Sequence, residues 1–453
     1  MIGVQTIGNA TLVAYDKLPI LATDPWMGGS HSAYWGSWRL PYDIPSNIRA
    51  DIIKSEYIWF SHGHQDHLNP DSLHLFKNNK ILISDHFGSR ICKDLKSENF
   101  KVTVLEDRKW ISLSKNISIM SISTKIQDSI LLLRVNDDIF INLNDAGPYS
   151  SRFIKKTISK FKRKFLLSIS SFDADMCNFF DENNNFIKPL MAENFSAGKV
   201  LSTIANVLNA NFIIPFSSFH EYQREDSMWA NEYIYPIDKI SKDISKKHVY
   251  IKPFSFINCT KDDDFVPLNI IKKKLEPKAP ELFGDHWKDE LNNLDKKAIE
   301  NYFSKFLSFH EKVGFISFIV GGKEFNLKFN GPKNKGISFE LPRNSLLTAC
   351  KYRVFDDLLG ANFMKTKLYN LKSLYEPRVN FTHEICKIGD HGMAHTKEEL
   401  DKYKAYYAKK MGMEYFFDLF SDSCRDYFVY FFKNYQNSKY YDQFKKAYYY
   451  FLK

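Results

Sequence analysis

Short apolar or alternating segments that end at Asp, Asn, Gly or Pro dominate the first 150 residues. Such segments are typical of β-strands joined by sharp turns. Further along, segments 150–164 and 196–208 have helical spacing and alternate with strand-like runs. A strand cluster followed by this alternation predicts a layered α/β domain that extends to about residue 255. The predicted strands are residues 4–7, 11–15, 20–23, 57–60, 81–84, 102–105, 117–122, 129–135, 139–143, 166–171 and 211–216.

Three further regions follow this predicted domain at residues 1–255. Residues 256–285 are polar, contain prolines and carry an acidic and a basic run, so we expect a linker there. Residues 286–395 combine helical spacing with strand-like runs, which predicts a smaller accessory α+β domain. Residues 396–453 have the pattern of an aromatic-rich helical tail, whose rings we expect to pack the end of the chain onto the body.

Composition is that of an ordinary globular protein, with 44% hydrophobic and 26% charged residues. No apolar run approaches the roughly 18 residues of a membrane-spanning helix, and the first residues do not resemble a secretory signal. We therefore expect a cytoplasmic protein with no membrane partner. The six cysteines form no CxxC pair and no CxH motif. This spacing excludes a zinc ribbon, a Rieske cluster of the usual type and a thioredoxin-like motif.

The net charge is +10, and the basic residues are spread along the chain. A solvated surface is the simplest explanation of this excess. The functional alternative is attraction of a small anionic substrate, such as a nucleotide sugar or a phosphate ester. A nucleic-acid partner is disfavoured because the basic residues are not gathered into one patch of sequence. The sequence leaves the oligomeric state open.

The segment SHGHQDH at residues 61–67 is the most informative part of the chain, and it directly follows an apolar strand. His62 and His64 are two residues apart, so they point the same way in an extended loop. Asp66 and His67 are adjacent and can turn toward a second point. Imidazole and carboxylate groups at this density predict a site for zinc, iron or manganese.

This HxHxDH pattern resembles the signature of the metallo-β-lactamase superfamily. The resemblance extends upstream to ATDPW at residues 22–26 and downstream to FINLND at residues 140–145. It implies an α/β fold, the metallo-β-lactamase αββα sandwich, with a metal site at one edge of the sheets. It also implies that Asp24 orients a metal-bound histidine without binding the metal itself.

The same resemblance implies a dinuclear centre. His62 and His64 would hold one metal, Asp66 and His67 would hold the other, and Asp145 would bridge the two. Asp66 and Asp145 are thus the predicted catalytic carboxylates.

A closer resemblance is to the catalytic region of the CMP-N-acetylneuraminate hydroxylase family, without its Rieske domain. It covers about the first 375 residues and weakens toward their end. It implies a di-iron oxygenase that acts on a nucleotide-activated acylamino sugar and receives electrons from a separate donor. The residues that carry this resemblance are Asp24-Pro25-Trp26, Gly28, Trp35, the segment 61–68, Gln127-Asp128-Ser129, Asn144-Asp145, Ile214-Pro215-Phe216 and, more weakly, 354–359 and 361–364.

Two positions depart from the hydrolase pattern of the superfamily. The histidine expected between residues 115 and 130 is missing, and Asp128 is the only carboxylate there. Asp128 is therefore a candidate metal ligand, with a strand-capping or outer role as the alternative. The last histidine is expected directly after Pro215, whereas His220 comes several residues later. His220 is a candidate for either a metal ligand or a substrate contact.

Three kinds of function are compatible with these residues. Three histidines and two aspartates, with Asp128 as a possible further carboxylate, make this site richer in carboxylates than the histidine-filled sites of the hydrolases, which favours a di-iron oxygenase with two metal ions and an external electron donor. A dinuclear zinc hydrolase that cleaves a phosphoester, lactone or amide is the alternative. A binding protein on an inactive fold is the third, and the intact segment 61–67 argues against it.

An aromatic loop follows Asp24 and precedes Arg39. Trp26 and Trp35 are candidates to stack on a base or sugar, and Arg39 is a candidate phosphate contact; ordinary hydrophobic packing of the rings is the alternative. A second group with metal-ligand chemistry lies near residue 390, where capping or surface roles are favoured over a metal site. Its members are His383, Asp390, His391 and His395.

Overall fold

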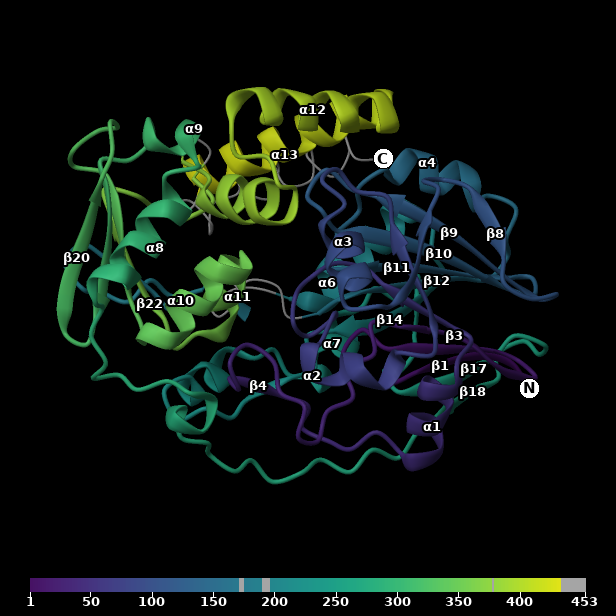
Figure 1. The fold of residues 1–453 in the computed structure, drawn as a ribbon. Helices are drawn as coiled ribbons and strands as arrows, with labels where there is room; N and C mark the ends of the chain where they lie inside the picture. Colours follow the sequence, from purple (N-terminus) through teal and green to yellow (C-terminus); the bar gives the residue numbers. More distant parts are fainter. Residues whose placement is uncertain (171–174, 190–195, 377–378, 433–453) are drawn as a thin grey trace.

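Two β-sheets packed face to face form the body of the molecule (Figure 1). The computed structural model describes residues 1–170, 175–189, 196–376 and 379–432. The first sheet has the order β18-β17-β1-β2-β3-β5-β6-β7 and the second has the order β16-β14-β12-β11-β10-β9-β8. In the first sheet the strands are β1 (Ile2–Thr6), β2 (Leu12–Asp16), β3 (Leu18–Thr23), β5 (Tyr57–Phe60), β6 (Lys80–Ser84), β7 (Lys101–Leu105), β17 (Ser255–Asn258) and β18 (Phe265–Pro267). In the second they are β8 (Trp110–Ser112), β9 (Ile117–Ser123), β10 (Ser129–Val135), β11 (Asp138–Asn144), β12 (Lys164–Ile169), β14 (Phe212–Ser217) and β16 (Val249–Tyr250).

Each sheet changes from antiparallel to parallel pairing partway across. In the first sheet β1 to β3 form antiparallel hairpins, and β3, β5, β6 and β7 are parallel. In the second, β8 to β11 are antiparallel, and β11, β12, β14 and β16 are parallel. The carboxyl ends of parallel strands meet at one edge of a sheet, where loops gather functional side chains. This topology brings the ends of β3, β5, β11 and β14 to the region of the predicted metal ligands.

Helices cover the outer faces of both sheets, which completes an αββα sandwich. Apolar side chains of β10, β11 and β12 pack on the helices of the second sheet. The first sheet packs its outer face on helices of its own connections and on the accessory unit. The covering helices are α4 (Ser151–Thr157), α6 (Ala197–Leu208) and α7 (Ile237–Asp243) on one side, and α1 (Ser46–Lys54), α2 (Pro70–Leu73) and α3 (Arg90–Ser97) on the other. The α/β sandwich predicted from the sequence is confirmed.

A smaller α+β unit lies beside the sandwich (Figure 1). Its sheet has the order β13-β22-β21-β19-β20. One apolar core runs without interruption from the outer face of the first sheet into this unit, since both contribute to the same buried cluster. The strands are β13 (Phe179–Asp181), β19 (Phe315–Val320), β20 (Lys323–Lys328), β21 (Gly336–Glu340) and β22 (Lys365–Tyr369), and the helices are α8 (Asn293–Phe303), α9 (Leu307–His310), α10 (Arg343–Tyr352) and α11 (Phe355–Ala361).

Two segments cross the domain boundaries expected from the sequence. The predicted linker at 256–285 begins inside the first sheet, because β17 pairs with β1 and β18 pairs with β17. Conversely, β13 belongs by sequence to the predicted catalytic domain, yet it pairs with β22 of the accessory sheet. The sandwich and the accessory unit therefore exchange segments.

The C-terminal helices begin with a π-helix, η5 (Thr382–His391), followed by α12 (Lys397–Met411) and α13 (Met413–Phe432). The rings of α12 pack on the body as expected: the Tyr407 hydroxyl contacts His86 Nδ1 at 2.9 Å, and the Tyr403 hydroxyl donates to the Lys125 carbonyl at 2.6 Å. On α13, Tyr415 is buried, whereas Phe416 and Phe420 are each 58% exposed, so this helix buries only some of its rings. The rest of the predicted tail lies outside the described residues. No described helix has the length and apolarity to span a membrane.

Candidate metal centre

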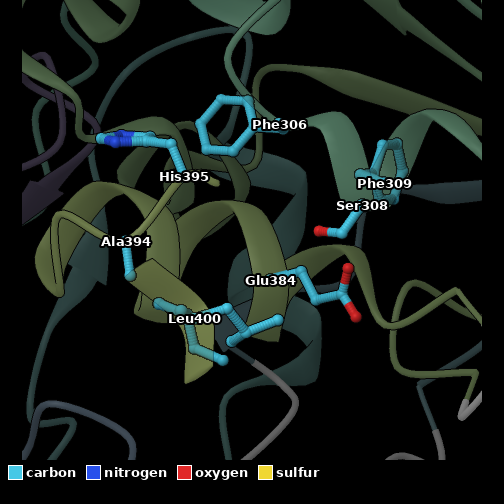
Figure 2. Close-up of a pocket in the computed structure, with 8 residues that line it drawn as sticks. Phe306, Ser308, Phe309, Glu384, Ala394, His395 and Leu400 are labelled. Atoms are coloured by element: carbon cyan, nitrogen blue, oxygen red, sulfur yellow. The ribbon is translucent and has the colours of Figure 1, made fainter. Parts of the chain in front are cut away.

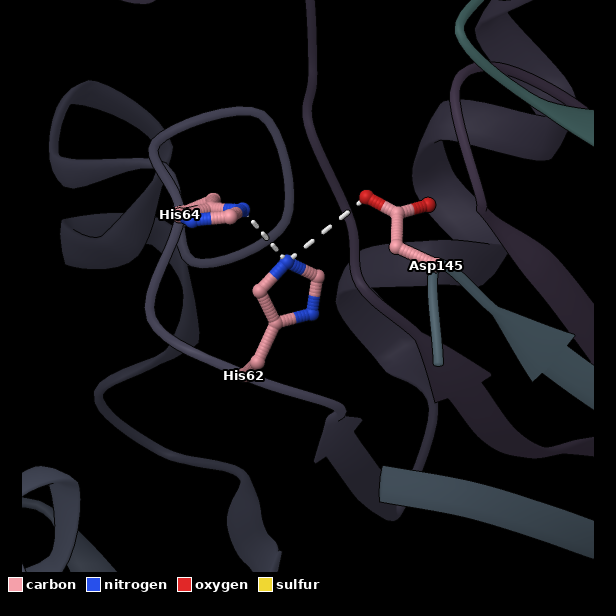
Figure 3. Close-up of side chains that lie close together, drawn as sticks. All are labelled: His62, His64 and Asp145. Carbon is pink, nitrogen blue, oxygen red and sulfur yellow. Dashed lines mark hydrogen bonds and ion pairs between the residues drawn. The ribbon is translucent and has the colours of Figure 1, made fainter. Parts of the chain in front are cut away.

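The first half of the centre comes from the loop after β5. His62 Nε2 and His64 Nδ1 face each other at 2.9 Å, and Asp145 Oδ2, which follows β11, lies 3.8 Å from His62 Nε2 (Figure 3). The three ligand atoms lie within 4.8 Å of one another, which is close enough for one metal ion to contact all three. Two strand ends from different sheets thus supply one predicted ligand set.

The second half lies on the other side of the same carboxylate. His67 Nε2 is 3.3 Å from Asp66 Oδ2 and also 3.3 Å from Asp145 Oδ2. The Asp145 oxygen Oδ2 therefore lies between the two predicted histidine sets, as a bridging ligand requires. The structure brings together all five residues predicted to form the dinuclear centre.

Hydrogen bonds fix the histidines with their inner nitrogens toward Asp145. Ser61 Oγ donates to Asp24 Oδ2 at 2.7 Å and accepts from His62 Nδ1 at 2.9 Å, which leaves His62 Nε2 to face inward. Asp24 Oδ2 also accepts from His67 Nδ1 at 3.0 Å. A metal-binding imidazole carries its proton on the outer nitrogen, where a carboxylate or hydroxyl holds it. Asp24 thus has the outer position predicted for it, and it is completely buried.

Asp66 has two partners that the sequence did not indicate. Its Oδ2 accepts from Asn9 Nδ2 at 2.7 Å, and its Oδ1 accepts from the Tyr34 hydroxyl. Asn9 lies in the β1–β2 turn and Tyr34 in the aromatic loop, so no spacing rule connects either to residue 66. Tyr34 and Asp24 also have positive φ angles, of 54° and 39°. Backbone strain of this kind is concentrated at functional sites, where surrounding contacts hold it in place.

The histidines and carboxylates of the centre shift one another's pKa values. Burial lowers the pKa of His62 well below its usual value, and the neighbouring His67 and His64 lower it further, so the ring is neutral. Burial raises the pKa of Asp145, but His67, together with His64 and the Ser217 hydroxyl, outweighs it and brings the pKa to about 2. Asp66 and Asp145 in turn raise the pKa of His67 well above its usual value against the effect of burial. A bound metal ion would displace that proton, and the mixed imidazole and carboxylate donor set fits iron, zinc or manganese.

Asp128 lies at the edge of this group, paired with a lysine. Its Oδ1 is 3.5 Å from Lys387 Nζ, and Lys387 Nζ is 3.2 Å from His64 Nε2. Lys387 belongs to η5, so the accessory part of the chain places a cation beside the first ligand set. Asp128 as a direct ligand stays a prediction.

His220 stacks on an aromatic ring and, among the described residues, makes no hydrogen bond or ion pair with the two ligand sets. Its ring is parallel to Trp38, with centroids 3.3 Å apart, and neither ring nitrogen has a hydrogen-bond partner within the described part of the chain. The nearest carboxylate oxygen with a recorded contact, Asp175 Oδ1, is 3.9 Å from Nε2. The two predicted roles of His220 stay predictions, and its surroundings are aromatic.

The proposed substrate contacts have structural partners of their own. Trp26 is completely buried, and its indole nitrogen donates to the His31 carbonyl at 2.8 Å. Arg39 pairs with Glu221 at 2.9 Å. Trp35 is partly exposed and meets Phe363 edge to face. Of these three side chains, Trp35 and Arg39 are partly exposed and Trp26 is completely buried.

Of the second candidate group near residue 390, Asp390 and His395 make packing contacts, and His391 lies beside the metal centre. Asp390 accepts from the Tyr302 hydroxyl at 2.6 Å, and the His395 ring packs on Phe306. His391 instead points to Asp356, with Nε2 at 3.1 Å from Oδ2. A small hollow between α9 and η5 is lined by Phe306, Ser308, Phe309, Glu384, Ala394, His395 and Leu400, among others (Figure 2). None of the five centre residues lines this hollow.

No protein-family model matches the chain. A protein of Mycolicibacterium smegmatis that carries the name of a Rieske 2Fe-2S iron–sulfur protein is 26% identical over 158 residues, which is 32% of this chain and 30% of that protein. A Mycobacterium tuberculosis protein of the same name is 24% identical over 160 residues, with the same shares. The chain thus spans less than a third of the length of these curated relatives.

Solved structures of similar fold include enzymes of two chemistries. The diiron β-hydroxylase CmlA of Streptomyces venezuelae is 11% identical, with a TM-score of 0.36, over 57% of this chain and 54% of that chain. The isothiocyanate hydrolase from Delia radicum gut bacteria is 14% identical, with a TM-score of 0.39, over 57% and 99%. The metallo hydrolase Igni18 of Ignicoccus hospitalis is 12% identical, with a TM-score of 0.36, over 56% and 97%. Hydroxylase and hydrolases lie at the same level of similarity, so these comparisons favour neither chemistry.

Proposed function

We propose that this protein is a metal-dependent enzyme with a dinuclear centre. His62 and His64 hold one ion, Asp66 and His67 hold the other, and Asp145 bridges them. The observation that carries this proposal is the position of Asp145 Oδ2, 3.8 Å from His62 Nε2 and 3.3 Å from His67 Nε2. Since each histidine turns an inner nitrogen toward this region, the donor atoms are already oriented for binding.

We further propose that the reaction is a di-iron oxygenation. Two carboxylates among five ligands, with Asp128 nearby, favour iron over zinc, because oxygen-activating iron sites use few histidines and at least one carboxylate. Iron, when bound, would supply the activation of dioxygen. The sequence match to proteins named for a Rieske cluster supports a separate electron donor, because such clusters transfer single electrons.

The proposed substrate is a nucleotide-activated acylamino sugar or a related small anion. The net charge of +10 would favour its approach. Within the site, the Lys387 ammonium lies 3.5 Å from Asp128 and would partly offset the carboxylates that repel an anion. The Tyr34 hydroxyl and Asn9 would hold Asp66 in one orientation while the substrate binds.

Elemental analysis of anaerobically purified protein tests both proposals. About two irons per chain would support the oxygenase, and CMP- and UDP-activated acylamino sugars would then be screened with dioxygen and a reductant. About two zincs would replace it with a hydrolase, tested on phosphoesters, lactones and amides. Absence of both ions after reconstitution would refute a metalloenzyme. His62→Ala is expected to lower the metal content. His248→Ala is the matched control, because His248 belongs to neither ligand set and its ring contacts the Ala210 carbonyl.

A further inference from the structure

Three side chains from the C-terminal part of the chain converge on His64. Asp356 belongs to α11, and Lys387 and His391 belong to η5. Asp356 Oδ2 is 2.9 Å from His64 Nε2, and Lys387 Nζ is 3.2 Å from the same nitrogen. The nitrogen on the other side of the ring, Nδ1, is the one that faces His62. The two edges of the imidazole therefore face different parts of the protein.

We propose that Asp356 is a positioning residue for His64, so that the accessory unit completes the metal centre. As a carboxylate, Asp356 accepts the proton on His64 Nε2, which leaves the Nδ1 lone pair to face the first metal position. In this tautomer the Lys387 ammonium, which can only donate, does not hydrogen-bond Nε2 and lies there as the charge partner of Asp128 and Asp356. The geometry repeats that of Asp24, whose Oδ2 is 3.0 Å from His67 Nδ1. A partner on the outer nitrogen fixes both the tautomer and the orientation of a metal-binding histidine. This inference rests on the proposed dinuclear centre.

Contacts around Asp356 hold it in this position. His391 Nε2 lies 3.1 Å from Oδ2 and 3.3 Å from Oδ1, and only 5% of Asp356 is exposed. The loop of the metal motif approaches closely from the other side: a Cβ on Gly63 would lie 3.3 Å from His391 Nδ1. A glycine between the two histidines therefore lets the loop lie against the π-helix. π-Helical turns are often found at functional sites.

The same side chains form a second group with metal-ligand chemistry, because atoms of His64, Asp356 and His391 lie within 4.8 Å of one another. Lys387 argues against an ion there. Its ammonium is 3.2 Å from His64 Nε2 and 4.0 Å from Asp356 Oδ2, so a cation already occupies the space next to the donors. A metal ion at this place would meet a like charge at short range.

Asp356→Asn tests the inference, with Asp390→Asn as the matched control. Asp390 is completely buried and accepts from the Tyr302 hydroxyl at 2.6 Å and from the Phe355 backbone N–H at 3.3 Å, but within the described part of the chain it makes no hydrogen bond or ion pair with His64. Cobalt(II) titration, followed by its visible absorption bands, would report the affinity for each ion. We expect Asp356→Asn to weaken one of the two ions about 10- to 100-fold and to shift its bands, while Asp390→Asn changes neither. Asp356→Glu is expected to restore part of the affinity.

The tautomer of His64 can be read separately, by long-range ¹⁵N–¹H NMR of metal-free protein with labelled histidine. We expect a proton on Nε2 in the unchanged protein and a mixture of tautomers in Asp356→Asn. Equal weakening of both ions in the two Asn variants would overturn the inference, as would an unchanged tautomer. Three ions per chain, falling to two in Asp356→Asn, would also overturn it and assign the group as a metal site. If no ion binds but the tautomer changes as expected, the dinuclear proposal fails while the contact of Asp356 with His64 stands.

Discussion

Replacing the Asp145 carboxylate is the most direct perturbation of the dinuclear centre. In Asp145→Ala each metal position would lose one of its three protein ligands, because Asp145 Oδ2 faces both His62 and His67. Loss of an outer partner of a ligand typically weakens metal binding 10- to 100-fold, so loss of a direct ligand is expected to cost at least about 100-fold, or about 2.7 kcal/mol per ion. The structure assigns this cost to both ions at once.

The consequence for metal content follows from mass action. At a free metal concentration about tenfold above the dissociation constant of the unchanged protein, occupancy is about 90%, and a 100-fold weaker site would be about 9% occupied. In protein dialysed against a metal buffer at that concentration, the metal content should fall from about 1.8 ions per chain to about 0.2. Elemental analysis against protein concentration is the assay.

The exposed Asp137, at the opposite end of β11, provides the control. Asp137→Ala should bind as much metal as the unchanged protein. If Asp145→Ala kept two ions per chain at the same free metal concentration, Asp145 would not be the bridge and the two ligand sets would be independent. A loss of exactly one ion would mean that Asp145 serves a single position.

Three further outcomes follow from residues around the centre. Asp24→Asn should weaken the ion held by His67 about 10- to 100-fold in a metal titration; equal affinity would show that Ser61 alone orients the rings. Arg224→Met should lower the free energy of unfolding by about 3–5 kcal/mol in denaturant titrations. The substitution removes the guanidinium that lies 2.7 Å from the Asp285 carboxylate, which is 0% exposed. A loss below about 1 kcal/mol would contradict the importance of this ion pair. Burial raises the pKa of Asp418 on α13 to about 7, so the folded state favours the protonated carboxyl. The free energy of unfolding should therefore fall as the pH rises from about 4 to about 7, by up to about 1.4 kcal/mol per pH unit. Hydrogen exchange of α12 and α13 should therefore be faster at pH 8 than at pH 5 after correction for intrinsic rates, and Asp418→Asn should remove the difference; an equal difference in the variant would assign the effect to another group.

The parts of the centre that adjoin strands were predictable from the sequence. The motif after β5 and Asp145 after β11 are each marked by a hydrophobic run that ends in polar groups. The two strands belong to different sheets, and the face-to-face packing of these sheets brings their ends together. The contacts of Asp356 and Lys387 with His64 were not predictable. They join residues 292 and 323 positions apart, and no local pattern shows which buried carboxylate of an accessory unit will meet a distant loop.

The domain boundaries were mispredicted for a similar reason. The segment of β17 looks like a linker because the polar run that follows it dominates its neighbourhood, yet its backbone completes the first sheet beside β1. The aromatic loop shows the opposite effect. Its rings suggested a stacking surface, but tertiary packing buries Trp26, and Trp38 donates its indole N–H to the Gly360 carbonyl at the end of α11.

The uninterrupted apolar core between the first sheet and the accessory unit has a consequence for cooperativity. Opening the accessory unit alone would expose the outer face of that sheet to water, at a cost proportional to the apolar area uncovered. Partial unfolding that spares the sandwich is therefore penalised, and the two regions form one folding unit rather than two foldons. The contacts that hold His64 therefore persist as long as the whole chain is folded. A destabilising substitution far from the centre would raise the fraction of fully unfolded chains, and it would not produce folded chains in which the accessory unit alone has opened.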